Sequence, residues 1–165
     1  MKKVYTKRGD QGVTTDYSGR KLPKDDALII SVGKIDSLQS SMDLAVLKSM
    51  GSTRETIMWI QKKLWQTAGE LACADKSCVI DPITEEDLKK LEAFTDSIGE
   101  PPSKFVRFNT EESIMYNECR IRCRDLETSL VKLLREEKVT PIAFQFINRL
   151  SSMFFMLAYK AGIHE

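Results

Sequence analysis

The chain has 165 residues, of which 42% are hydrophobic and 30% charged, with 8 Gly and 5 Pro. This composition excludes a collagen-like, low-complexity or wholly disordered chain, because it supplies enough apolar surface for the core of one domain. The 25 Lys and Arg residues against 24 Asp and Glu give a formal charge of +1. A dedicated nucleic-acid-binding protein is disfavoured, since such proteins carry a basic excess.

Neither membrane insertion nor secretion is indicated. No apolar run approaches the roughly 18–20 residues that span a bilayer, and the opening MKKVYTKRGDQG has no apolar signal-peptide region. The chain has four cysteines, of which Cys119 and Cys123 fall within a helical pattern, and this favours free thiols in a reducing compartment over a secreted disulfide framework. We therefore expect a single cytoplasmic domain over residues 1–165, with no nucleic-acid or membrane partner.

Residues 1–32 differ in character from the rest of the chain. They contain Gly9, Gly12 and Gly19 without a sustained apolar period, which predicts a loop that becomes ordered on binding a ligand and ends in the apolar run 27–30. The stretch TKRGDQGVTT combines glycines, hydroxyls and cations, the chemistry that surrounds polyphosphates. It matches neither a Walker A motif nor a dinucleotide motif. A plain flexible tail is the alternative interpretation.

Helical periodicity begins at about residue 33 and continues to the end of the chain. We predict helices over about 34–48, 53–74, 84–98, 111–136 and 141–160. Thr84 with Asp87 forms a weak capping-box pattern, and Pro141 occupies a favoured first-turn position. Residues 104–108 are expected to be extended. Five helices joined by short loops predict an all-α five-helix bundle over 33–165.

The fourth predicted helix carries the most informative polar pattern. Its residues Asn117, Arg120, Arg124 and Glu127 are spaced three, four and three apart, which puts them on one face. Arginine presents donors in a fixed fork that suits phosphate oxygens, so this face could bind an anion. The alternative is a solvated stripe stabilised by an Arg124–Glu127 pair.

Other site chemistries lack support in the sequence. Cys119 and Cys123 share a helix face, but the one histidine is His164 and no Cys-x-x-Cys occurs, so buried structural thiols are favoured over zinc and we predict no metal site within the protein. A serine or cysteine hydrolase is unsupported for the same reason. Aromatic residues of the last helix, such as Phe155, are expected mostly in the core, with any remainder facing an oligomer partner or a flat cofactor.

Several separated motifs together resemble a known family. The stretches VYTKRGDQGVTT, GRKLPKDD and GKIDSL, then Arg120-x-x-x-Arg124-x-x-Glu127 and FINRLS, are similar in kind and order to motifs of PduO-type ATP:cob(I)alamin adenosyltransferases. The resemblance covers essentially the whole chain.

This resemblance implies a homotrimer of five-helix bundles with active sites at the subunit interfaces. It implies transfer of the 5′-deoxyadenosyl group of ATP to the cobalt of a reduced corrinoid, cob(I)alamin, with release of triphosphate and assistance from Mg²⁺. A reductase and an adenosylcobalamin-dependent enzyme are the candidate protein partners. Because cobalt is the nucleophile, the protein needs no catalytic base and has to position the reactants and stabilise the leaving group.

The resemblance also assigns roles by position. The residues expected to support catalysis are Arg124, Glu127, Arg120 and Asp36, the last two as an ion pair between subunits. The residues expected to bind ATP or the corrinoid are Thr6, Lys7, Arg8, Gly9, Thr14, Thr15, Lys24, Arg124, Glu127, Thr128, Asn148 and, below the corrin, Phe105.

Some positions depart from the family pattern. Asp125 replaces a basic residue, Thr128 an arginine and Asn117 a histidine, while Asn109-Thr110 stands where the family has Gly-Gly. The phosphate site is therefore less positive than the family pattern implies. Two further hypotheses remain open: a non-catalytic relative that carries or senses ATP or a corrinoid, and a helical-bundle interaction module.

Overall fold

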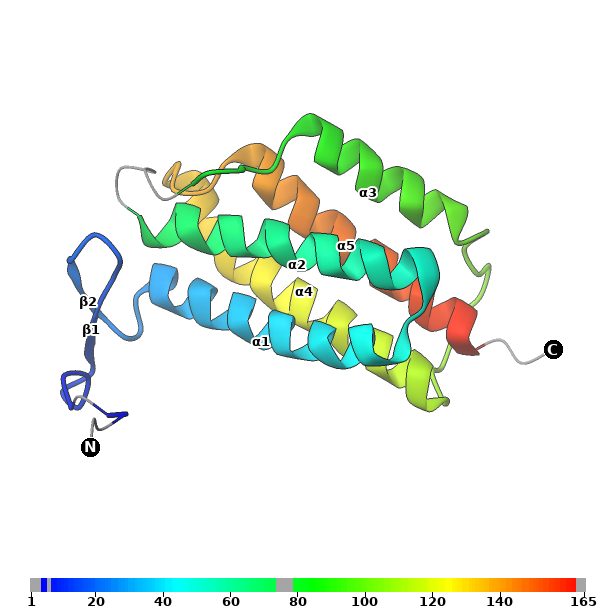
Figure 1. Ribbon diagram of the computed structural model, residues 1–165, viewed down its shortest axis with the longest axis horizontal. Helices are drawn as coiled ribbons and strands as arrows, with labels where there is room; N and C mark the ends of the chain where they lie inside the picture. The colour runs from blue at the N-terminus through cyan, green and yellow to red at the C-terminus, as the bar shows by residue number, and fades with distance from the viewer. Residues whose placement is uncertain (1–3, 6, 74–78, 163–165) are drawn as a thin grey trace.

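The computed structural model describes residues 4–5, 7–73 and 79–162. Five helices make up most of this part of the chain, preceded by two short strands (Figure 1). The elements are β1 Val13–Thr15, β2 Lys21–Pro23, α1 Ala27–Lys48, α2 Gly51–Ala72, α3 Glu85–Ser97, α4 Glu111–Arg135 and α5 Pro141–Gly162. The predicted all-α five-helix bundle is confirmed. No helix in these described ranges is long and apolar enough to cross a membrane.

Helix α4 lies at the centre of the bundle. It packs against α1 on one side and α5 on the other, while α2 packs on α1 and α3 on α5. The buried face of α4 consists of Ser113, Tyr116, Cys119, Cys123, Leu126, Leu130 and Leu133. Phe146 and Phe154 of α5 are among the largest side chains fully enclosed in the core. Burial of this one face leaves the charged residues Arg120, Arg124 and Glu127 of α4 outside the core.

Helix α1 begins at Ala27, earlier than the predicted start near Lys34. Asp26 caps it, since its side chain accepts a hydrogen bond from the Leu28 backbone N–H at 2.9 Å. The apolar run 27–30 is therefore the first turn of α1 and not the end of a loop. Gly33 lies on an exposed face within α1 and does not interrupt the helix.

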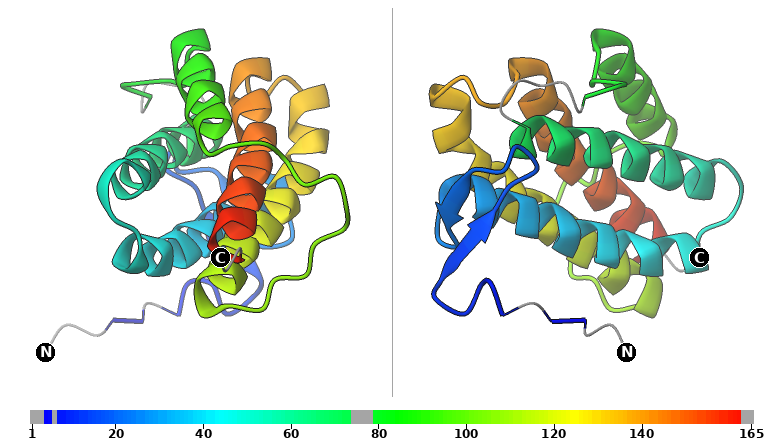
Figure 2. Two further views of the ribbon diagram at one scale, coloured as in Figure 1. Left: turned by 90° about the vertical axis from the view of Figure 1, so that its right-hand side faces the viewer. Right: turned by 60° about the vertical axis from the view of Figure 1, so that its left-hand side comes forward.

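The N-terminal segment contains a β-hairpin where the sequence predicted an irregular loop. β1 and β2 pair antiparallel, with Thr14 opposite Leu22 and Thr15 opposite Lys21. The turn between them is closed by Asp16, whose carboxylate accepts from the backbone N–H and Nε of Arg20 at 2.9 and 2.7 Å. Leu22 packs against the core and anchors the hairpin beside the start of α1 (Figure 2).

The segment between α3 and α4 crosses the end of α5 and swings away from the bundle before α4 begins (Figure 2). Phe108 anchors it by a T-shaped contact with Phe155, with ring centroids 6.1 Å apart. It contains no strand, and Phe105 within it is 96% exposed. Thr110 then caps α4 by accepting a hydrogen bond from the Ser113 N–H at 3.0 Å. Thr110, which stands where the family pattern has a glycine, therefore supplies a helix cap.

Candidate functional site

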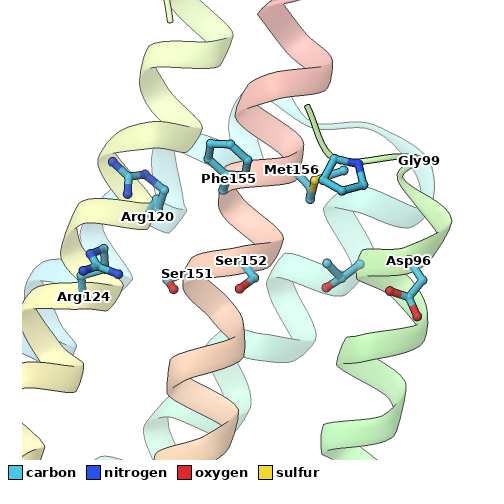
Figure 3. A pocket seen from close by; sticks show the side chains of 10 residues that line it. Asp96, Gly99, Arg120, Arg124, Ser151, Ser152, Phe155 and Met156 are labelled. Atoms are coloured by element: carbon cyan, nitrogen blue, oxygen red, sulfur yellow. The ribbon is translucent and has the colours of Figure 1, made fainter. Parts of the chain in front are cut away.

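Arg120 and Arg124 of α4 line a groove between α3, α4 and α5 (Figure 3). The groove has a volume of about 450 Å³. Its other lining residues come from the end of α3, the segment that follows, and α5: Thr95, Asp96, Gly99, Pro101, Ser151, Ser152, Phe155 and Met156. It combines two guanidinium groups with an aromatic and a thioether side chain, so it can take a ligand that is anionic at one end and apolar at the other.

The predicted polar face of α4 makes a specific contact with α5. Glu127 Oε1 accepts a hydrogen bond from Asn148 Nδ2 at 2.6 Å, so the structure brings these two predicted site residues together. No Arg124–Glu127 ion pair occurs in the described residues. Arg124 is exposed, and its guanidinium has no hydrogen-bond or ion-pair partner in the same part of the chain. The Arg124–Glu127 pair of the alternative interpretation is therefore absent from the described residues.

The remaining predicted residues of α4 and α1 lie around this face. Arg120 is half-buried and donates from Nε to Asn117 Oδ1 at 2.8 Å, while Thr128 is exposed and donates to the Arg124 carbonyl at 2.9 Å. Asp36 is exposed on α1. Within the described ranges, Asp36 and Arg120 do not pair with each other or with any other charged side chain.

The hairpin lies at the end of the bundle where α1 begins (Figure 1), and its residues line a second hollow of about 730 Å³. Its lining includes four predicted nucleotide-binding residues, Arg8, Gly9, Thr14 and Thr15, and also Lys21. Lys7 is exposed beside it with a left-handed φ of 59°. Thr6 lies outside the described residues.

Lys24 is held close to the glycine loop. Its backbone N–H donates to the Gly12 carbonyl at 2.8 Å. A Cβ added at Gly9 would lie 2.9 Å from Lys24 Nζ, so only glycine lets the ammonium approach this closely. Backbone amides, hydroxyls and cations thus converge in the manner expected of a polyphosphate site.

The two groups of predicted residues are separate within one chain. The groove and the hairpin hollow share no lining residue. Among the described residues, no hydrogen bond or ion pair joins the hairpin to Arg124, Glu127 or Asn148. Phe105 likewise reaches neither hollow.

Sequence reasoning missed several lining residues. Lys21 becomes a candidate because the hairpin register sets it opposite Thr15, and a predicted hairpin could have revealed it. Asp96, Ser151 and Ser152 line the groove through the packing of α3 on α5, for which the sequence carries no signal. Phe155, expected mostly in the core, is half-buried and lines the groove.

The two thiols of α4 are unreactive at neutral pH. Burial raises the pKa of Cys119 to about 12 and that of Cys123 well above its usual value, so both stay protonated at neutral pH. Both are free, as expected, whereas Cys73 is disulfide-bonded and the expectation of a free thiol is wrong for that residue. No cluster of three or more metal-ligating side chains occurs in the described ranges.

Comparison with known proteins establishes the family. Residues 4–161 match the family model described as cobalamin adenosyltransferase, and the chain therefore belongs to this family. It is 30% identical to the corrinoid adenosyltransferase of Bacillus subtilis, over 94% of this chain and 84% of that protein. It is 29% identical to a corrinoid adenosyltransferase of Citrobacter freundii, over 96% of this chain and 94% of that protein.

Solved structures that resemble this chain come from the same family as its sequence relatives. One variant of the PduO-type ATP:corrinoid adenosyltransferase of Lactobacillus reuteri, complexed with cobalamin and ATP, matches with a TM-score of 0.84 at 26% identity, covering 97% of this chain and 91% of that one. Another variant of the same enzyme, complexed with ATP, matches with a TM-score of 0.82 at 29% identity, over 96% and 94% of the two chains.

Proposed function

We propose that this protein is an ATP:corrinoid adenosyltransferase. The observation that carries the proposal is a pair of hollows that include predicted residues: a hairpin of glycines, hydroxyls and cations, and a groove lined by Arg120 and Arg124 of α4 together with Phe155 and Met156 of α5. The family match over residues 4–161 and the PduO-type relatives complexed with cobalamin and ATP support it.

In the proposed reaction, cobalt of the reduced corrinoid attacks C5′ of ATP. The new cobalt–carbon bond uses the electron pair of Co(I), and the C5′–oxygen bond breaks to release triphosphate. The chain's own residues hold the reactants and stabilise the charge that develops on the leaving oxygens. Arg124 with the hairpin cations Arg8 and Lys24 suits this role, while Glu127 and Asn148 suit the hydroxyls of the nucleoside.

A complete site would combine the hairpin of one chain with the groove of its neighbour in a homotrimer. Three observations support this arrangement: the two hollows are separate within one chain, Asp36 and Arg120 have no charged partner in the described residues, and Phe105 projects into solvent. Across an interface, Asp36 and Arg120 would neutralise each other, which matters because an unpaired buried charge is costly.

An apolar surface beside these charges supports assembly as well. Leu44 and Leu47 of α1 are 61% and 74% exposed, and Ile114 of α4 is 53% exposed. These side chains surround a hollow of about 280 Å³ between the two helices. Ile121 lies two turns along α4 from Ile114 and directly follows Arg120 in the sequence, so it extends the apolar surface toward that arginine. Burying these side chains against a second copy would remove them from water.

Mg²⁺ would enter the site bound to the phosphates of ATP. The ion commonly uses substrate phosphates and water with few protein ligands, which fits a hairpin rich in cations and hydroxyls. The reaction is proposed for the cytoplasm, because Co(I) is strongly reducing and needs a reducing compartment. A reductase that supplies the corrinoid and an enzyme that uses the adenosylated product are the proposed protein partners.

The test is adenosyltransfer with ATP, Mg²⁺ and cob(I)alamin under anaerobic conditions. We expect the Co(I) absorbance to disappear with formation of equal amounts of adenosylcobalamin and triphosphate. Binding of ATP or corrinoid without product would instead identify a carrier or sensor. An interaction module without a nucleotide site would show no ATP-dependent protection of residues 1–25 from protease.

A further inference from the structure

Asn148 lies between two charged side chains that both act on its amide. Its Nδ2 donates to Glu127 Oε1 at 2.6 Å, and its Oδ1 accepts from Arg149 Nη1 at 2.9 Å. The same guanidinium donates through Nε to Glu92 Oε1 at 2.9 Å. A line of hydrogen-bonded side chains therefore runs from Glu92 of α3 through α5 to Glu127 of α4.

The two neighbours impose the same orientation on the amide. A carboxylate can only accept and a guanidinium can only donate. Turning the amide over would set its oxygen against Glu127 and its nitrogen against Arg149, and two charge-assisted hydrogen bonds would be lost together. Arg149 thus determines which end of Asn148 faces Glu127. Neither residue lines the groove itself, and Arg149 lines an adjoining hollow that shares Thr95, Asp96 and Ser152 with it.

We propose that Arg149 is a positioning residue for the nucleoside of ATP and acts through Asn148. The inference rests on the proposed function. With the amide held, one N–H of Asn148 and one carboxylate oxygen of Glu127 remain for a ligand, in fixed positions relative to each other. A sugar hydroxyl can accept from the first and donate to the second. Glu92 holds Arg149 in place from α3.

The first measurement compares Arg149→Met with a matched control, Arg122→Met. Arg122 pairs with Glu118 at 2.7 Å, with side chains 43% and 46% exposed, and Arg149 pairs with Glu92 at 2.9 Å, with side chains 46% and 41% exposed. Arg149→Met should raise KM for ATP, and the calorimetric Kd for ATP without corrinoid, about three- to tenfold. KM for cob(I)alamin should stay unchanged, and Arg122→Met should change none of these values.

The second measurement is a double-mutant cycle on the Kd for ATP. If Arg149 acts through Asn148, Arg149→Met should have no further effect in the Asn148→Ala background. Losses that add would overturn the proposal, as would equal effects of the two arginine variants. Glu92→Gln should also weaken ATP binding, but by less than Arg149→Met does. It serves as the probe if Arg149→Met fails to fold.

The two proposals can fail separately. If wild-type protein forms no adenosylcobalamin but the cycle still shows coupling between Arg149 and Asn148, the proposed activity is wrong and the positioning role stands. If product forms and the losses add, the positioning role alone is wrong. A wild-type protein that binds no ATP would overturn both.

Discussion

Arg124 is the cation on which the chemical proposal depends most, because it lines the groove without an ion-pair partner among the described residues. If it stabilises triphosphate as it leaves, its contribution grows in the transition state and turnover should fall more than ATP affinity. Arg124→Ala should cost about 1.5–3 kcal/mol, roughly a ten- to more than hundredfold loss in kcat. Steady-state adenosyltransfer measures this loss.

Two variants sharpen that experiment. Arg124→Lys keeps the charge but not the forked geometry, so it should restore part of the rate. Arg135→Ala removes an exposed arginine from the last turn of the same helix, outside the groove, and should leave kcat unchanged. A folded Arg124→Ala protein with wild-type kcat would show that this residue plays no part in the chemistry.

Gly9 controls how closely Lys24 approaches the hairpin loop. A methyl group at this position would lie 2.9 Å from Lys24 Nζ, so Gly9→Ala should displace the ammonium and raise KM for ATP about three- to tenfold. Little stability should be lost, since the clash is with the end of a flexible side chain. Gly19→Ala is the comparison, because it strains a left-handed turn without meeting Lys24. Equal KM values for the two variants would exclude this role for Gly9.

The residues that the sequence could identify are those with a local pattern. The spacing of Arg120, Arg124 and Glu127 was enough to predict a shared helix face. Arg120 and Arg124 line the groove, whereas Glu127 does not and contacts α5 instead. The hydrogen bond between Glu127 and Asn148 could not be predicted from spacing, because it depends on how α5 packs against α4. The same applies to Asp96, which α3 brings to the groove.

Helix α3 is joined to α2 by a charged contact at its first turn. Lys63, whose side chain is 8% exposed, donates to Asp81 at 2.9 Å and lies 3.0 Å from Asp87. Asp87 also accepts from the Thr84 N–H at 2.9 Å and completes the predicted capping box. Burial alone would raise the pKa of Asp87, but hydrogen bonds from Lys63 and Thr84 outweigh it and lower the pKa. For Lys63, the two carboxylates outweigh burial and raise the pKa.

These opposite shifts define a pH window for the contact. Stability from Asp87 is present above its unfolded pKa, about 3.9, and is lost as the pH falls through the lower folded value. Stability from Lys63 is present below about 10.4 and is lost as the pH rises through the higher folded value. Thermal unfolding of wild type and Asp87→Asn should therefore differ at pH 7 and converge below about pH 4. A constant difference in Tm down to pH 2 would contradict this account.

At the level of elements, the sequence predicted five helices and most of their ends. It placed the start of α1 too late because the run 27–30 and Gly33 were interpreted as a loop boundary, whereas the Asp26 cap and the burial of Leu28 extend the helix. The hairpin was missed because its strands have three residues each, too short to show an alternating pattern.

At the level of the whole molecule, the proposed ion pair between Asp36 and Arg120 predicts how charge changes affect the trimer. At micromolar concentration, sedimentation of the wild-type protein should give a molar mass three times that of the 18.8 kDa chain. Asp36→Arg would place like charges together at the proposed interface, which costs several kcal/mol, and should produce monomers. Combining it with Arg120→Asp restores opposite charges and should restore the trimer. A wild-type monomer with full activity would contradict the proposed assembly.

The central claim is that the hairpin of one chain and the groove of another form one adenosyltransfer site. It is tested most directly by mixing two impaired proteins, Arg8→Ala/Lys24→Ala and Arg124→Ala, and refolding them into mixed trimers whose composition is verified by mass. Each site in a cyclic trimer would draw its two halves from different chains, so random mixing should restore about a quarter of wild-type activity. Mixed trimers that are no more active than either parent protein would contradict the claim.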